Sequence, residues 1–302
     1  MIMHKSVLFD EVLDGLNIIP SGKYIDATLG YGGHASGVLN RLDKKGFLFA
    51  FDQDTDAINF SKKRLSEISE NFMIIKSNFK DMKKYIDVNV DGIMFDLGVS
   101  SPQLDETSRG FSFHTDALLD MRMDKENNFS AYNVVNEYSL EKLTEIFYLY
   151  GEEKNAKAIA KAIIRNRPIN TTLELAELIK GNVPISYRNA SHPARKVFQA
   201  IRIEVNHELE ILESSLLNAF DLLNSGGRIC VITFHSLEDR IVKNVFKKLS
   251  SEDENAINLP IVPEELKAKA KLINKKPITA SEEELNINNR SRSAKLRIIE
   301  KL

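Results

Sequence analysis

The sequence predicts an α/β fold whose parallel sheet is covered on both faces and whose chain carries an inserted all-helical domain. Short apolar runs of buried-strand type alternate with helical patterns up to residue 97, and the same alternation resumes after residue 225. Between them lie about one hundred residues that show helical stripes and no convincing strand. We therefore expect a discontinuous domain of residues 1–104 and 205–302, interrupted by a helical domain of residues 105–204.

Each expected strand is a short apolar run that a polar or turn-forming segment ends. The six runs are KYIDA (23–27), GFLFAFD (46–52), FMIIK (72–76), DGIMFDL (91–97), GGRICVITFHS (226–236) and AKLRIIE (294–300). Asp54 is placed to cap the helix that follows the second run, and Thr172 to cap a helix that ends at Gly181. One long helix is expected over about 197–224. Residues 250–290, which are polar and contain prolines and lysines, are expected to form a long loop or a small excursion.

Composition excludes several classes of protein. The net charge of −2 provides no global positive field for nucleic acid, although local basic clusters remain. The single cysteine, Cys230, excludes an intrachain disulfide and a multi-thiolate zinc site, and the scattered histidines indicate no metal. No apolar stretch approaches the roughly 18 residues of a membrane span, and the amino terminus lacks a signal-peptide core. The expectation is a cytoplasmic protein with neither a membrane nor a metal partner.

The loops at the carboxyl ends of the strands carry the candidate binding residues, since ligands of open α/β sheets lie there. The first loop, TLGYGGH, lacks the Gly-Lys-Ser/Thr end of a phosphate-binding Walker loop. Its glycines partly fit a dinucleotide fingerprint, with Asp52 about 20 residues further on, so a dinucleotide stays open. Asp26 at the end of the first strand and the absence of a second nucleotide-binding half argue against it.

S-adenosyl-L-methionine fits these loops better than a dinucleotide does. Glycines allow close approach of the methionyl part, Asp52 supplies a carboxylate for the ribose diol, and Phe79 supplies a wall for adenine. Acidic side chains also attract a cationic ligand. Each of these residues could instead have a purely structural role: the glycines in a tight turn, Asp52 as a helix cap and Phe79 as a core side chain. A binding site is favoured only because all of them lie at successive strand ends.

Longer motifs carry a resemblance to one family. They are HKSVLFDEVL (4–13), FDLGVSSPQLD (95–105), RGFSF (109–113), LDMRMD (119–124), YGEE (150–153), FQAIRIEVNHEL (198–209), TFHSLEDRIVK (233–243) and RSRSAKLR (290–297). Together they resemble the bacterial 16S ribosomal RNA cytosine-N4 methyltransferases, essentially from end to end. The resemblance implies a Rossmann-like S-adenosylmethionine-dependent methyltransferase domain with a helical substrate-recognition insertion. It also implies methylation of a cytidine in the decoding region of the small ribosomal subunit.

The family's cofactor contacts carry over onto residues of the strand-end loops. By resemblance these are Gly32, Gly33, His34, Asp52, Phe79, Asp96 and Gln103. Asp96 is also the candidate catalytic residue, because an acceptor for an amino hydrogen would help the poorly nucleophilic cytosine amino group. The alternative is that Asp96 only binds the methionyl amino group. The segment 109–124 is expected to line the pocket for the target base, and the alternative is a linker between domains.

The expected partner is 16S rRNA within the small subunit, and a homodimer is left open. Three local groups of basic residues could contact phosphates, although each could also be a solvated surface. They are Arg290, Arg292, Lys295 and Arg297; Lys154, Lys157, Lys161, Arg165 and Arg167; and Arg195 with Lys196. Two other functions stay open: an S-adenosylmethionine methyltransferase acting on another RNA, and a non-catalytic ribosome-assembly factor. The intact glycine loop and Asp52 disfavour the second.

Overall fold

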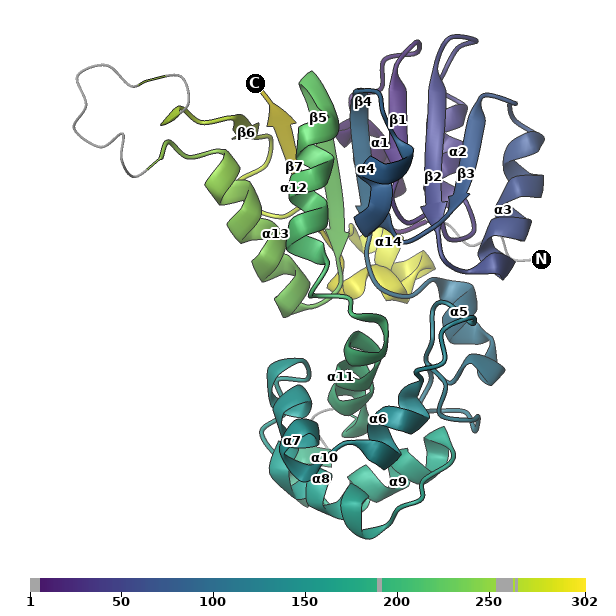
Figure 1. The fold of residues 1–302 in the computed structure, drawn as a ribbon, viewed down its shortest axis with the longest axis vertical. Helices are drawn as coiled ribbons and strands as arrows, with labels where there is room; N and C mark the ends of the chain where they lie inside the picture. Colours follow the sequence, from purple (N-terminus) through teal and green to yellow (C-terminus); the bar gives the residue numbers. More distant parts are fainter. Residues whose placement is uncertain (1–5, 189–191, 254–262, 264–265) are drawn as a thin grey trace. The chain divides into compact units, whose positions relative to one another are not determined.

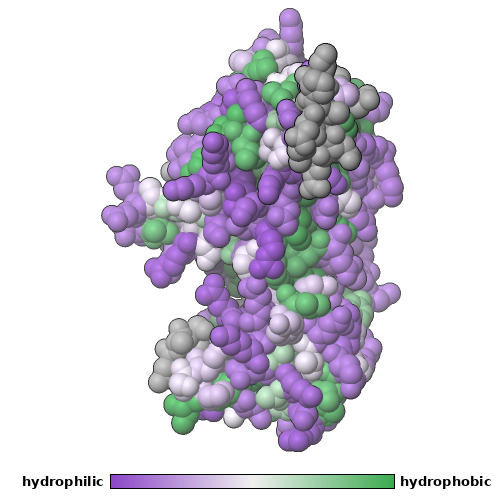
Figure 2. All heavy atoms as spheres, turned by 90° about the vertical axis from the view of Figure 1, so that its left-hand side faces the viewer, coloured by the Kyte–Doolittle hydropathy of each residue, from purple (hydrophilic) through white to green (hydrophobic). Residues whose placement is uncertain are grey.

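The computed structural model describes residues 6–188, 192–253, 263 and 266–302. His4 and Lys5 of the amino-terminal motif, and part of the expected 250–290 loop, lie outside the described residues. The chain divides into two compact units, one of residues 1–98 and 209–302 and one of residues 99–208 (Figure 1). Hydrophilic residues cover most of the face drawn in Figure 2, where hydrophobic residues form separate groups.

The first unit is a seven-stranded sheet with the strand order β3-β2-β1-β4-β5-β7-β6. The strands are β1 (Lys23–Asp26), β2 (Phe47–Asp52), β3 (Phe72–Lys76), β4 (Val90–Asp96), β5 (Leu223–Thr233), β6 (Ala270–Leu272) and β7 (Lys295–Lys301). Strands β1 to β5 pair in parallel, whereas β7 pairs antiparallel with both β5 and β6. The sheet is therefore mixed, and the predicted parallel sheet is its larger part.

Helices cover both faces of this sheet because neighbouring strand residues point to opposite sides. Ile25 packs in one core with apolar residues of α4 (Met82–Tyr85), α12 (Leu212–Leu222) and α13 (Ser236–Leu249). Tyr24 packs in the other core with residues of α1 (Phe9–Gly15), α2 (Gly33–Leu39) and α3 (Thr55–Ser66). Asp54 caps α3 as predicted, its side chain accepting a hydrogen bond from the Asp56 amide. The remaining elements are η1 (Phe79–Asp81), α14 (Glu282–Ile287) and η5 (Asn289–Ser293).

The second unit consists of helices around a separate hydrophobic core. Its elements are α5 (Ser101–Asp105), η2 (Thr107–Arg109), α6 (Ala131–Glu137), α7 (Leu140–Leu149), α8 (Ala156–Arg165), α9 (Thr172–Gly181), α10 (Ile185–Arg188) and α11 (Ala194–Asn206). Their apolar stripes meet in this core; on α8, for example, Ile159 and Ile163 are fully buried. The described part of the chain contains no helix long and apolar enough to cross a membrane.

Three local predictions were wrong. The long helix expected over 197–224 is two helices, α11 and α12, because His207 takes a left-handed conformation with φ 53° that ends α11. The cap of α9 is Thr171, whose side chain accepts from the Glu174 amide, and Thr172 is buried inside the helix. The short strand β6 and the helix α14 lie in the region expected to be a long loop or a small excursion.

Candidate functional site

Three aspartates lie at the carboxyl edge of the sheet in the first unit. Asp26, Asp52 and Asp96 are the last residues of β1, β2 and β4. Parallel pairing places these strand ends together, since Asp26 is in register with Ala50 of β2 and Met94 of β4. The edge of the sheet therefore gathers carboxyl groups from strands that are far apart in the sequence.

The glycine loop between β1 and α2 is tied to Asp52. The Gly30 amide donates to Asp52 Oδ2 at 2.7 Å, and the Asp54 amide donates to Oδ1 at 2.8 Å. Gly32 caps α2 in a left-handed conformation with φ 72°, which a side chain would strain. At Gly33 a Cβ atom would collide with the Ser6 hydroxyl. The loop is therefore a close-packed turn whose shape requires glycine at position 32, and whose position 33 packs against Ser6.

A hydroxyl and an imidazole connect this loop to Asp96. Thr28 Oγ1 accepts a hydrogen bond from the Asp96 amide at 2.6 Å, and the Thr28 amide donates to Asp26 Oδ1 at 3.0 Å. His34 Nε2 lies 3.0 Å from the Val7 carbonyl oxygen, so a neutral ring carries its proton there and leaves Nδ1 as an acceptor. That Nδ1 lies 3.7 Å from Asp96 Oδ2.

Burial and mutual repulsion shift the pKa values of these acidic groups upward. Burial, then the charges of Asp26 and Glu238, raise the pKa of Asp96 to about 8. Burial also raises the pKa of Asp26 to about 7 and that of Asp52 to about 6. Burial disfavours the charged form of a base as well, so it lowers the pKa of His34 to about 4. In the free protein at neutral pH, Asp96 is therefore mostly protonated and His34 is neutral.

Two buried polar atoms at this edge lack a hydrogen bond to any described residue. They are Asp96 Oδ1 and His235 Nε2. His235 caps α13, and its Nε2 lies 3.0 Å from Glu238 Oε1 without hydrogen-bonding geometry. Buried polar atoms are nearly always paired in proteins, so the unsatisfied Asp96 oxygen indicates a group that the protein alone does not supply.

The other two predicted contacts lie in different places. Phe79 begins η1 directly after β3, and its half-buried ring meets Phe95 edge-on with 5.5 Å between the centroids. Gln103 belongs to the helical unit, where it is buried on α5. Its Oε1 accepts from the Ser100 amide at 3.0 Å as part of a capping box. The structure thus gathers the glycine loop, His34, Asp52 and Asp96, and places Gln103 in the second unit.

Sequence reasoning missed three residues that shape the site: Thr28, Ser61 and Glu238. Ser61 of α3 donates to the Gly30 carbonyl at 2.7 Å. Glu238 is 2% exposed, and its Oε2 accepts from the Phe234 amide at 2.8 Å. The signal for Glu238 was its place three residues after the cap of α13, the spacing of a capping box. Thr28 and Ser61 had no such local signal.

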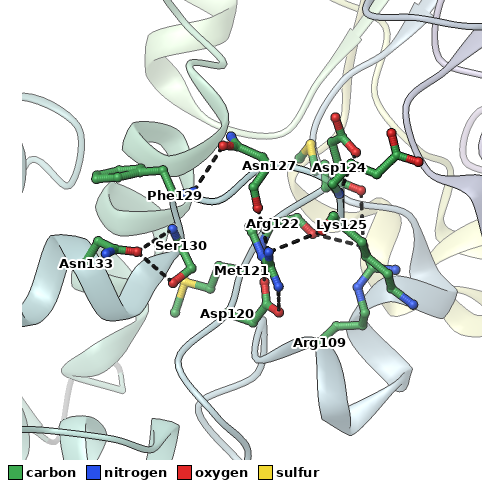
Figure 3. Close-up of polar contacts among 12 residues, drawn as sticks. Arg109, Asp120, Met121, Arg122, Asp124, Lys125, Asn127, Phe129, Ser130 and Asn133 are labelled. Atoms are coloured by element: carbon green, nitrogen blue, oxygen red, sulfur yellow. Dashed lines mark hydrogen bonds and ion pairs between the residues drawn. The ribbon is translucent and has the colours of Figure 1, made fainter.

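The segment 109–124 of the helical unit is held by its own arginines (Figure 3). Arg109 is 3% exposed and donates to the carbonyl oxygens of Arg122 at 2.9 Å and Met123 at 3.2 Å. The Arg122 guanidinium binds Asp120 through two hydrogen bonds of 2.7 and 2.8 Å. Both arginines therefore hold the shape of the segment.

No group of three or more His, Cys, Asp or Glu residues is placed to hold a metal ion in the part of the chain that the structure describes. Cys230 is buried in β5, where burial raises the pKa of its thiol.

Comparison with solved structures finds proteins of similar length. An rRNA methylase from Streptococcus thermophilus matches with 13% identity and a TM-score of 0.46, covering 100% of this chain and 99% of that one. A candidate rRNA methylase from Clostridium thermocellum matches with 15% identity and a TM-score of 0.48, covering 99% and 100%. A candidate methyltransferase from Streptococcus mutans in complex with SAH matches with 14% identity and a TM-score of 0.45, again covering 99% and 100%. Comparison with family models matches residues 1–302 to the MraW methylase family.

Proposed function

The chain belongs to the MraW methylase family, and we propose that it methylates the N4 amino group of a cytidine in the 16S rRNA of the small ribosomal subunit, in the decoding region. The methyl donor is S-adenosyl-L-methionine. The observation that supports the proposal most is the acidic edge of the sheet, where a buried Asp96 oxygen lacks a partner among the described residues. A cationic nucleoside would supply positive charge to the same groups whose pKa values are raised there.

The residues at this edge fit S-adenosylmethionine in chemical type. Gly32 and Gly33 allow the backbone to approach the methionyl part, beside His34. Backbone amides donate to both Asp52 oxygens, and a lone pair that remains on the carboxylate can accept from a ribose hydroxyl. Phe79 would form the adenine wall, and Gln103 is retained as a proposed contact. When bound, the cofactor supplies an electrophilic methyl group on a positively charged sulfur.

Asp96 is proposed to act on the amino group of the base. The lone pair of that nitrogen is delocalised into the cytosine ring, which makes it a weak nucleophile. A carboxylate that accepts one amino hydrogen favours a lone pair directed at the methyl group, and it receives the proton once the new bond has formed. Holding the nitrogen in line would contribute up to roughly 7–11 kcal/mol. A bound cation nearby lowers the pKa of Asp96 and so favours the carboxylate form that this role needs.

The target base must leave the RNA stack or lie in a single strand before it can reach a buried carboxylate. We assign the recognition of the RNA to the helical unit of residues 99–208, and the lining of the base pocket to its segment 109–124. This assignment is supported by the hydrogen bonds through which Arg109 and Arg122 hold that segment, since loops positioned by a scaffold often carry binding residues.

The experiment is mass spectrometry of ribosomal RNA from cells with and without the protein. Loss of one methyl group from the N4 atom of one small-subunit cytidine, restored by the wild-type chain but not by Asp96→Ala, is the expected result. Asp87→Ala changes an exposed aspartate ahead of β4 and is the matched control that should restore the methyl group. Loss from a different RNA would contradict the proposed substrate. Calorimetric binding of NAD or ATP in place of S-adenosylmethionine would contradict the proposed site.

A further inference from the structure

Charge is strongly segregated within the helical unit. Residues 154–196 contain nine basic and two acidic side chains, whereas residues 105–153 contain four basic and eleven acidic ones. The net charge is +7 for residues 154–196 and −7 for residues 105–153. The two values cancel, so the small net charge of the whole chain does not reveal this segregation. A local excess of this size produces a field that a polyanion can use even when the net charge is near zero.

Helix α8 places four of these basic residues on one exposed side. Their spacing of three, four and four residues returns them to the same face of a helix. They are Lys154, just before the helix, and Lys157, Lys161 and Arg165 within it, and we call this set the α8 basic face. All four are exposed, while the opposite side of α8 is buried through Ile159, Ala160 and Ile163.

The α8 basic face is not neutralised from within the protein. Among the described residues, none of its four side chains takes part in an ion pair or a side-chain hydrogen bond. Elsewhere in the same unit cations are paired: Lys142 with Glu145 at 3.2 Å, and Lys180 with Glu177 at 3.2 Å. Like charges four residues apart destabilise a helix by about 0.2–0.5 kcal/mol per pair, so folding alone does not favour this arrangement.

A further cation extends this surface at its amino-terminal end. Lys196 of α11 donates from Nζ to the Glu152 carbonyl oxygen at 2.9 Å, two residues before Lys154. Gln199 of the same helix donates to the Tyr150 carbonyl oxygen at 3.0 Å, which fixes α11 against this turn. From Lys157 to Arg165 the face runs about 12 Å along the helix, at about 1.5 Å per residue. That is long enough to meet several phosphates of one strand.

We propose that the α8 basic face is a docking surface for the sugar–phosphate backbone of the substrate RNA. The inference rests on the RNA substrate proposed above and specifies which surface binds its phosphates. Unpaired lysine and arginine side chains bind phosphates by releasing the counterions of the RNA, which gives affinity and register without sequence readout. A membrane surface is disfavoured, because an interfacial helix inserts an apolar face, and the apolar face of α8 is buried in the core.

The test is a triple variant, Lys157→Ala, Lys161→Ala and Arg165→Ala. Alanine favours helix, so α8 should remain folded, and removing the repulsion should not lower the midpoint of unfolding. The matched control, Lys243→Ala, Lys247→Ala and Lys248→Ala, removes three exposed lysines from α13 of the other unit. For each protein, affinity for small-subunit RNA is measured over a series of salt concentrations, together with methylation kinetics and calorimetry of S-adenosylmethionine.

The expected result is a slope of log affinity against log salt that is smaller by about 2–3 in the triple variant, at about 0.7–0.9 per lost phosphate contact. The KM for RNA should rise at least about tenfold, with kcat at saturating RNA and cofactor affinity unchanged. The control should keep the wild-type slope. An unchanged slope in the triple variant, or an equal loss in the control, would overturn the inference while wild-type methylation still supports the proposed function. A wild-type protein that neither binds nor methylates RNA would instead refute the proposed function itself.

Discussion

Replacing Asp96 by asparagine should stabilise the free protein, and the gain should increase with pH. The wild-type carboxyl group has a pKa of about 8 in the folded state, against about 3.9 for an aspartate in an unfolded chain. The folded state therefore binds the proton more tightly. The stability that this group contributes is fully present below about pH 4 and is lost as the pH rises towards about 8. The amide of the Asp96→Asn variant cannot ionise, so the variant does not undergo this loss.

The size of the effect follows from the same shift. Each pH unit between the two pKa values corresponds to about 1.4 kcal/mol, so the change from about pH 5.5 to about pH 8 is at most about 3.4 kcal/mol. One oxygen of Asp96 is buried, but the side chain as a whole retains 28% of its exposure, and solvent screening reduces the value. We expect the stability difference between Asp96→Asn and wild type to grow by about 1–2 kcal/mol over this range.

Urea denaturation of both proteins without cofactor, at several pH values, measures this difference directly. Asp87→Asn, at an exposed position of the same unit, is the control whose difference from wild type should stay constant with pH. A difference for Asp96→Asn that stays constant within about 0.5 kcal/mol, or that shrinks as the pH rises, would refute the account of Asp96 as a buried acid repelled by its neighbours.

Three more outcomes are expected. Gly32→Ala forces a side chain into a left-handed conformation and places a Cβ atom 3.0 Å from Ser61 Oγ, so it should lower the free energy of unfolding by about 1–2 kcal/mol; an unchanged urea midpoint would contradict this. In the wild type, calorimetry should find S-adenosylmethionine affinity rising from about pH 6 to about pH 8 with proton release, because the cation binds the ionised form of Asp96. Affinity that is flat over this range would show that Asp96 does not face the cation. Arg109→Lys loses the guanidinium Nη2 group that donates to two carbonyl oxygens and should lower the free energy of unfolding by about 1–3 kcal/mol in urea melts.

The sequence was most informative where a local pattern determines the structure. Strands β1 to β4 lie within about two residues of the predicted runs, because a continuous buried apolar run leaves few alternatives. The break between α11 and α12 was not predictable, since no glycine or proline marks it and His207 itself takes the left-handed conformation. Strand β6 was missed because three residues, one of them a lysine, carry no usable alternation. The antiparallel direction of β7 depends on contacts with β5 that no local pattern contains.

In the candidate site, too, features set by a local pattern were predictable and features set by distant contacts were not. Asp26, Asp52 and Asp96 could be singled out because strand ends of a parallel sheet share one edge. The shift in the Asp96 pKa could not, since it depends first on burial, then on the charge of Asp26 and then on that of Glu238, which lies 142 residues further along the chain. Gln103 was chosen by resemblance alone, and the expected boundary after residue 104 assigned it to the discontinuous domain, whereas it lies in the unit of residues 99–208.

The Thr28 hydroxyl links the turn after β1 to the end of strand β4. Its Oγ1 accepts from the Asp96 amide at 2.6 Å and adds to the bond of 2.9 Å from the Ala27 amide to the Met94 carbonyl oxygen, while the Thr28 amide donates to Asp26. A ligand that reshapes the turn would act on the backbone of β4 through these bonds, so we expect cofactor uptake to shift the position of the Asp96 carboxyl group. Thr28→Val would preserve the bulk, remove the hydroxyl and weaken this link, leaving the backbone bond between Ala27 and Met94.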